Sequence, residues 1–257
     1  MAPKIAVDVT EAAPGVWFAR ARDVNWVLLA EGSDVVLVDA GYPGYADAVR
    51  ESLDRIGRRW SDVVAVLVTH GHVDHVGSLE TLSIVRDVPV YAGADELPNL
   101  RGERHESAGP REVRRHIAQR GVLPWAARIV RVGASEPVEV SGAVALDLLR
   151  QGDDGRLDLP GRPVPVATPG HTSGHTAYLL PDAGAVVSGD TLCTGHALSA
   201  VEGPQLLPDW FDHDRAGVVA SLDTLAALDA DLLLPGHGAL HRAPMAEAVG
   251  EARTRLG

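Results

Sequence analysis

The segment VTHGHVDHVG, residues 68–77, places three histidines and one aspartate within six consecutive positions. The four residues are His70, His72, Asp74 and His75. They follow the run DVVAVLV, residues 62–68, whose uncharged Val- and Leu-rich part predicts a buried β-strand. Imidazoles and a carboxylate crowded at the end of a buried strand indicate a metal site on a rigid scaffold.

The composition limits the class of protein. The chain has 257 residues and a single cysteine, Cys193, which excludes an internal disulfide framework. Its formal net charge of −12 disfavours nucleic acid as a partner. No stretch approaches the roughly 18 uncharged apolar residues of a membrane span, and residues 1–15 lack the apolar run of a secretory signal. We therefore expect a cytoplasmic protein, monomeric or homodimeric, without nucleic-acid or membrane partners.

Short apolar runs predict strands in both halves of the chain, and residues 45–56 and 214–228 show helical spacing. Residues 94–131 differ, because they are charged, poor in strand formers and interrupted by proline and glycine. We interpret them as a helical lid insertion with a helix over 110–121, followed by a strand over 136–140. The pattern predicts a single domain over 1–257 of the α/β (α+β) class, with two packed sheets and helices outside.

Three further apolar strands end in a Gly- or Pro-containing turn with one potential ligand. These ligands are His171, Asp190 and His237. Together with the first cluster they make seven candidates, too many for one tetrahedral ion. Seven ligands fit two ions about 3.5–4 Å apart that share a carboxylate. Histidine and carboxylate without thiolate suits Zn²⁺, Fe²⁺ or Mn²⁺.

The motif HGHVDH, residues 70–75, followed in order by His171, Asp190 and His237, resembles the metallo-β-lactamase superfamily. The resemblance runs from VLVDAG near residue 35 to LPGHG near residue 237. It implies a four-layered αββα sandwich with two divalent ions, Zn²⁺ being favoured, in a cleft at one edge of the sheets. It implies a first ion on His70, His72 and His171, a second on Asp74, His75 and His237, and Asp190 as the bridge.

The resemblance implies two further roles. Asp39, in VLVDAG, would support the metal-binding loops from behind. A hydroxide held between the ions would be the nucleophile, because zinc lowers the pKa of bound water to about 7. Asp74 would orient this nucleophile and is the predicted catalytic residue.

Residues beside the ligands, and aromatic residues elsewhere, are candidates for a substrate pocket. They are His175, His196, Trp210, Phe211 and Trp125. Trp125 lies in the insertion, which holds eight arginines between residues 101 and 131. These arginines are either a solvated helical face or contacts to an anionic substrate. We interpret Cys193 as a small buried side chain.

The resemblance leaves several activities to distinguish. True β-lactamases of the superfamily lack a bridging aspartate at the position of Asp190. Its quorum-signal lactonases use a tyrosine after that aspartate, and here no tyrosine follows Tyr178. Glyoxalase II has a C-terminal tyrosine and basic residues for glutathione, and here only Arg242 is available near His237. The candidate metal ligands of this chain agree with these enzymes better than the residues that would bind their substrates do.

We predict a dinuclear metal-dependent hydrolase that cleaves an ester, thioester or lactone of a small-molecule substrate. The alternative is a mononuclear iron oxidoreductase that resembles persulfide dioxygenases, which do not need His75 and His237 as ligands. A metal-binding protein without catalysis is disfavoured, because structural metal sites are usually closed.

Overall fold

The run DVVLV forms strand β4 (Asp34–Val38), and its neighbouring side chains enter two different hydrophobic clusters. Val35 and Leu37 pack in the cluster beneath the helices, whereas Val36 and Val38 pack in the cluster between the sheets. Because both faces of this strand are buried, its sequence is continuously apolar rather than alternating.

The structure is a computed structural model that describes residues 4–82 and 88–256. Within these residues the strands form a seven-stranded sheet, in the order β1-β2-β3-β4-β5-β6-β7, and a five-stranded sheet, in the order β12-β11-β10-β9-β8. The other strands of the first sheet are β1 (Asp8–Ala13), β2 (Val16–Arg20), β3 (Asn25–Glu31), β5 (Val63–Leu67), β6 (Val90–Ala92) and β7 (Val144–Ala145). The second sheet contains β8 (Val164–Ala167), β9 (Thr176–Leu180), β10 (Ala185–Gly189), β11 (Leu232–Pro235) and β12 (His241–Arg242).

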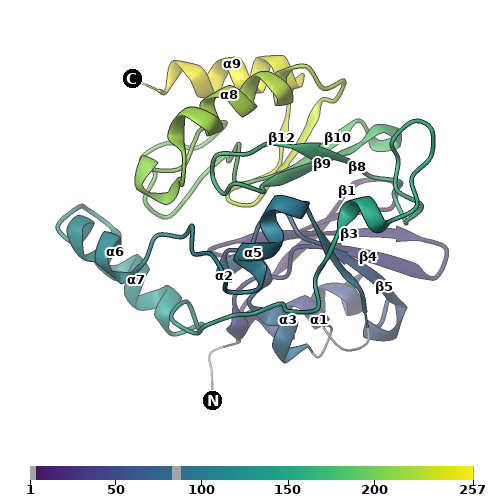
Figure 1. Cartoon of the computed structure of the whole chain (residues 1–257), viewed down its shortest axis with the longest axis horizontal. Helices are drawn as coiled ribbons and strands as arrows, with labels where there is room; N and C mark the ends of the chain where they lie inside the picture. The colour runs from purple at the N-terminus through teal and green to yellow at the C-terminus, as the bar shows by residue number, and fades with distance from the viewer. Residues whose placement is uncertain (1–3, 83–87, 257) are drawn as a thin grey trace.

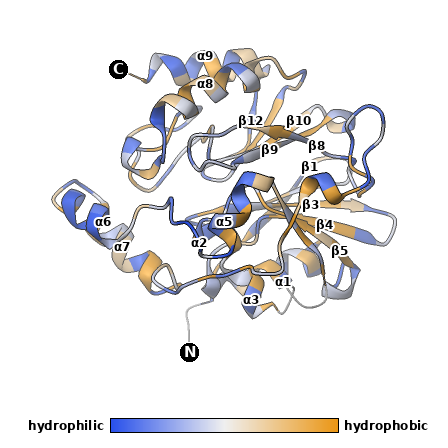
Figure 2. Ribbon diagram, in the orientation of Figure 1, coloured by the Kyte–Doolittle hydropathy of each residue, from blue (hydrophilic) through white to orange (hydrophobic). Residues whose placement is uncertain are grey.

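Helices cover the outer face of each sheet (Figure 1). Helices α1 (Ala46–Arg55) and α3 (Ser78–Thr81) pack on the seven-stranded sheet, and α8 (Arg215–Ala226) and α9 (Met245–Thr254) pack on the five-stranded sheet. The cluster between the sheets, to which Val36 and Val38 belong, also includes Leu29 and Tyr178. Figure 2 shows the hydrophobic residues concentrated in these strands. The four layers confirm the predicted αββα sandwich.

Residues 94–131 hold the 3₁₀ helix η3 (Ala94–Glu96) and helices α5 (Leu97–Leu100), α6 (Pro110–His116) and α7 (Val122–Val130). Helices α6 and α7 extend to one side of the sandwich (Figure 1). The predicted helix over 110–121 therefore ends early. Gly121, at a φ of 91°, adopts the left-handed conformation just before α7. Pro124 does not break that helix because proline is tolerated in a first turn. A lid motion of this segment stays a prediction.

The predicted strand over 136–140 is wrong. Pro137 has no N–H for a ladder, and the N–H of Val140 bonds to the carbonyl of Leu100 in the insertion instead. The remaining short elements are helix α2 (Val73–Val76) and the 3₁₀ helices η1 (Pro43–Tyr45), η2 (Trp60–Asp62), η4 (Leu146–Leu148), η5 (Pro181–Ala183) and η6 (Asp209–Phe211). None of the helices in the described ranges has the length and apolar character needed to cross a membrane.

Candidate metal centre

The strand ends bring the predicted ligands together at one edge of the sandwich. Strand β4 is parallel to β5, and β10 is parallel to β11, so each pair ends on one side of its sheet. The loops after β5, β8, β10 and β11 and the short helix α2 supply the seven residues. Among the described residues, three groups have ligand atoms within 4.8 Å of one another: His70, His72 and His171; His70, His75 and Asp190; and Asp74, His75 and His237.

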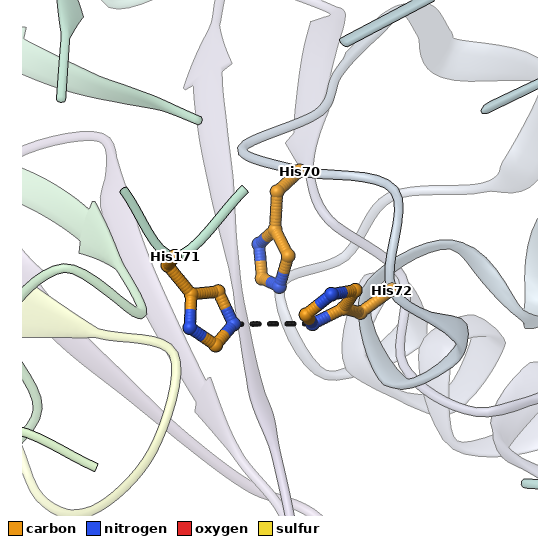
Figure 3. A group of neighbouring side chains, drawn as sticks. All are labelled: His70, His72 and His171. Atoms are coloured by element: carbon orange, nitrogen blue, oxygen red, sulfur yellow. Dashed lines mark hydrogen bonds between the residues drawn. The ribbon is translucent and has the colours of Figure 1, made fainter. Parts of the chain in front are cut away.

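The first group consists of three rings that face a common point (Figure 3). Nε2 of His171 lies 3.1 Å from Nδ1 of His72. The ring of His70 lies 4.4 Å from that of His72 and 4.8 Å from that of His171, centroid to centroid, and meets both edge-on. Such a convergence of ring nitrogens is the geometry of a metal site.

The other nitrogen of each ring in this group contacts the protein. Nδ1 of His70 lies 3.1 Å from Oγ1 of Thr69, and Nε2 of His72 donates to the carbonyl of Glu106 at 3.0 Å. Nδ1 of His171 lies 3.0 Å from Oδ1 of Asp212. These contacts fix each ring in one orientation, with its inner nitrogen toward the common point.

The set Asp74, His75 and His237 forms a second ligand group, which combines imidazoles with a carboxylate. Nε2 of His237 lies 3.1 Å from Oδ2 of Asp190 and 3.4 Å from Oδ2 of Asp74. Nε2 of His75 lies 3.4 Å from Oδ1 of Asp190, and Nε2 of His171 lies 3.5 Å from Oδ2 of the same residue. The carboxylate of Asp190 therefore lies between the two groups, where a shared ligand would have to be.

Asp39 lies directly behind this centre. Its Oδ1 accepts the N–H of Thr69 at 2.8 Å, and its Oδ2 accepts the hydroxyl of Thr69 at 2.7 Å and Nδ1 of His75 at 2.8 Å. Asp39 adopts a φ of 62°, a left-handed conformation that is uncommon outside glycine. Its place agrees with the supporting role that the sequence suggests.

The pKa values of histidines in the two groups shift in opposite directions. Burial holds the pKa of His70 well below its ordinary value and lowers that of His72 to about 4. Burial also opposes charge on His75 and His237, but Asp190 and its neighbouring carboxylates outweigh it. They raise the pKa of His75 well above its ordinary value and that of His237 to about 10. The carboxylates of the second group thus favour positive charge at the place where a cation would bind.

The carboxylates are correspondingly ionised. Burial disfavours their charge, but His75 and His237 hold the pKa of Asp74 and of Asp190 well below the ordinary range. For Cys193, burial, and then the nearby Asp190, raise the pKa of the thiol well above its ordinary value. Cys193 is therefore a buried thiol, and it belongs to none of the three groups of candidate ligands in the described residues.

These residues fit a pair of divalent ions. Nε2 of His70 and Nε2 of His75 are buried and have no hydrogen-bond partner among the described residues. Buried polar atoms without partners are rare, and one ion in each ligand group would satisfy these two nitrogens. A set of imidazoles and carboxylates without thiolate suits zinc, iron(II) or manganese(II).

Three acidic residues hold the loops of the centre, and the sequence did not indicate any of them. Asp212 contacts His171 and also accepts a hydrogen bond from Arg215 at 2.7 Å. Glu96 joins two ligand loops: its Oε1 accepts the N–H of Gly71, between His70 and His72, at 2.7 Å, and its Oε2 accepts the hydroxyl of Thr172 at 2.7 Å. Glu106 accepts the N–H of Ser173 at 2.7 Å. Each is a single acidic residue outside any motif, so no sequence signal marks it.

His175 lies behind the centre instead of in a pocket. It is 1% exposed, its Nε2 accepts the N–H of Asp190 at 3.0 Å, and its Nδ1 lies 2.9 Å from the hydroxyl of Thr168. Neither of the two cavities near the centre includes it in its lining. Its position is that of a support for the loop that carries Asp190.

The other pocket candidates form one aromatic cluster next to the second group. The ring of Trp125 lies 5.6 Å from that of Phe211 and 6.1 Å from that of Trp210. The ring of His196 lies 5.3 Å from that of Phe211 and 5.2 Å from that of His237. The cluster therefore joins α7 of the insertion to the metal centre through side chains.

Comparisons with known proteins agree with this fold and site. The family model described as Metallo-beta-lactamase superfamily matches residues 19–237. Probable metallo-hydrolase YflN of Bacillus subtilis (strain 168) is 30% identical over 243 residues, covering 89% of this chain and 85% of that protein. Hydroxyacylglutathione hydrolase of Synechococcus sp. is 28% identical over 179 residues, covering 70% of this chain and 53% of that protein.

Among solved structures, a metallo-beta-lactamase HARLDQ motif mutant from Cronobacter sakazakii superposes with a TM-score of 0.67 at 19% identity, covering 98% of this chain and 96% of that one. At that identity the likeness concerns the fold alone. The family match covers most of the chain, and the chain belongs to the metallo-β-lactamase superfamily. Its histidine and aspartate groups are consistent with the dinuclear metal site of that superfamily.

Gly236 is a sensitive position of the centre. A Cβ at this residue would collide with Oδ1 of Asp190 and lie 2.8 Å from Cε1 of His75. We expect Gly236→Ala to displace the Asp190 carboxylate and to reduce bound zinc, measured by elemental analysis after dialysis. Gly250→Ala in α9, where a Cβ meets no atom within 4 Å, is the matched control and should keep full metal content. Equal metal content in the two variants would contradict the packing described here.

The contact between Asp212 and His171 should contribute to metal affinity, which gives a second prediction. Asp212→Asn keeps the size of the side chain but removes the charge that fixes the ring. We expect zinc affinity, measured by competition with a chelator, to fall about 10- to 100-fold. The control is Asp209→Asn, an exposed residue of η6 three positions earlier, which should bind zinc like the unmodified protein. An unchanged affinity in Asp212→Asn would refute the supporting role.

Proposed function

We propose that this protein is a dinuclear metal-dependent hydrolase that cleaves an ester, thioester or lactone bond of a small molecule. The observation that carries the proposal is the position of Asp190, whose two oxygens lie 3.1 Å from His237, 3.4 Å from His75 and 3.5 Å from His171. A single carboxylate within reach of both ligand groups is the arrangement of a two-ion hydrolytic site.

Two ions bound there would polarise a carbonyl group and make water acidic enough to react near neutral pH. The protein would orient the attacking water. The side chain of Asp74 is 17% exposed, whereas those of His75 and Asp190 are 0% and 3% exposed. Asp74 is thus the carboxylate of the centre most open to solvent, and its ionised oxygen would accept a hydrogen bond from the attacking water and orient it.

The aromatic cluster supports an acyl or aromatic group as the part of the substrate near the centre. Trp210 and Phe211 stack on each other and are half-buried, so they offer apolar area, whereas Trp125 is buried beside them. His196 connects the cluster to His237. The relative named hydroxyacylglutathione hydrolase gives independent support to hydrolysis of an acylated small molecule. Small-molecule sites are commonly apolar with a few polar groups that set orientation.

The second ligand group also bears on the alternative, a mononuclear iron oxidoreductase. Such an enzyme would not need His75 and His237 as ligands. Here Asp39 holds Nδ1 of His75 and the carbonyl of Asp23 holds Nδ1 of His237, so both rings are oriented as ligands would be. This favours the dinuclear hydrolase.

Replacing the shared carboxylate tests the proposal. In Asp190→Ala we expect bound metal to fall below one ion per chain and hydrolysis of a panel of small esters, thioesters and lactones to drop by at least about 100-fold, because both ions lose a ligand. The matched control is Asp153→Ala, an exposed aspartate outside the ligand groups and outside the lining of both cavities, which should change neither quantity.

Two outcomes would overturn the proposal. Two ions per chain in Asp190→Ala would exclude the shared ligand. One iron per chain and no hydrolysis of any panel member by the unmodified protein would favour the oxidoreductase instead.

A further inference from the structure

A cavity of about 360 Å³ adjoins the second ligand group. One wall is the turn between β2 and β3, residues 20–25, and the opposite wall is the loop 195–202. His237 and Gly238 complete the lining. The volume lies in the range of cavities that hold small molecules.

The walls of this cavity are fixed to the metal centre by hydrogen bonds. The amide of Asn25 donates to the carbonyls of Pro235 at 2.9 Å and Gly238 at 2.8 Å, so the turn is attached to the loop that carries His237. The carbonyl of Asp23 accepts Nδ1 of His237 at 2.6 Å. A molecule in the cavity would therefore contact the same histidine whose Nε2 faces Asp74 and Asp190.

Two positively charged side chains of the cavity have no acidic partner among the described residues. Arg20 and Arg22 line it and are exposed, and neither forms an ion pair or a side-chain hydrogen bond within residues 4–82 and 88–256. Asp23 does not neutralise them, because Arg128 binds its carboxylate with two nitrogens, at 2.8 and 2.7 Å. The remaining acid in the lining is Glu202, in the opposite wall. Once the pair of Asp23 and Arg128 is set aside, the lining holds two arginines against one acid, which favours an anion.

The other cavity near the centre has the opposite character. It measures about 180 Å³, adjoins His72 and contains Glu106, Glu136 and Glu139 in its lining. Its basic residue Arg104 already pairs with Glu106 at 3.5 Å. An anion would be repelled there and attracted to the cavity beside His237.

We propose that Arg20 and Arg22 bind an anionic group of the substrate, a carboxylate or a phosphate, while the scissile carbonyl lies at the metal centre beside His237. The proposal rests on the hydrolase function above and narrows it to esters, thioesters or lactones that carry a negative charge away from the reacting bond. Guanidinium groups suit this role because they match the oxygens of carboxylate and phosphate with paired donors.

The arginines of the insertion do not compete for this role. Arg115 pairs with Glu112 on its own helix at 3.3 Å, Arg128 is bound to Asp23, and the cavity beside His237 is lined by neither. The sequence left two interpretations of these arginines open, a solvated helical face or contacts to an anionic substrate. The contacts support the solvated face, with structural ion pairs.

The test compares two substrates that differ in charge: mono-4-nitrophenyl succinate, which is anionic, and 4-nitrophenyl butyrate, which is neutral. The quantity measured is the ratio of their kcat/KM values. In the double variant Arg20→Gln/Arg22→Gln we expect this ratio to fall about tenfold or more, through KM, the size expected for two exposed charge pairs. Arg150→Gln, an exposed arginine outside both cavities, is the matched control and should leave the ratio unchanged.

A second measurement does not depend on turnover. Calorimetric titration of the metal-loaded protein with succinate and with inorganic phosphate should give binding of one anion or both, weakened about tenfold in the double variant. Binding of succinate alone identifies a carboxylate as the recognised group, and binding of phosphate alone identifies a phosphate.

The possible failures are distinguishable. If neither ester is hydrolysed by the unmodified protein but the anions bind in an arginine-dependent way, the hydrolase proposal is in error for these esters and the anion site stands. If both esters are hydrolysed, and the double variant changes neither the ratio nor the anion affinity, the hydrolase stands and the anion site is refuted. If this ratio falls in Arg114→Gln/Arg115→Gln instead, the anion binds to the insertion, and the anion site at Arg20 and Arg22 is also refuted.

Discussion

The metal centre depends on the carboxylate of Asp39. One oxygen accepts the N–H of Thr69, and the other accepts the Thr69 hydroxyl and Nδ1 of His75. Because the Thr69 hydroxyl donates to Asp39, its own oxygen can only accept from Nδ1 of His70. Nδ1 of each histidine is therefore the donor to the protein, and Nε2 is left to face the centre. Both Nε2 atoms are buried and have no hydrogen-bond partner within residues 4–82 and 88–256. A single carboxylate at the end of β4 thus prepares one ring in each ligand group.

Hydrogen bonds from distant parts of the chain orient the other three histidines of the centre in the same way. Asp212, from the loop before α8, orients His171, and the carbonyls of Glu106 and Asp23 orient His72 and His237. Glu106 lies in the connection between α5 and α6 of the insertion, and Asp23 is bound by Arg128 of α7. The insertion is consequently attached to both ligand groups, so a change in its position would alter the orientation of histidine rings in both groups. The opposite charges of the two adjoining cavities then give the centre one side suited to an anionic substrate.

The sequence predicted the features that repeat or cluster. Continuous apolar runs identified β4, β5, β10 and β11, because strands buried on both faces lose their polar alternation. It could not identify Asp212 or Glu96, whose partners lie 41 and 25 residues away and are brought near only by the packing of the layers. Helix α7 was missed since Pro124 resembles a break until its place in the first turn is known. The strand expected over 136–140 fails because its backbone bonds to the insertion and not to a sheet.

Two ions that share Asp190 would lie at a fixed separation. X-ray absorption spectroscopy on the zinc-loaded protein measures this separation, with zinc content determined on the same sample. We expect two zinc ions per chain, nitrogen and oxygen ligands without sulfur, and a zinc–zinc scattering distance of about 3.5–4 Å. One zinc per chain with no zinc–zinc scattering, or a sulfur ligand from Cys193, would contradict a pair of ions that share Asp190.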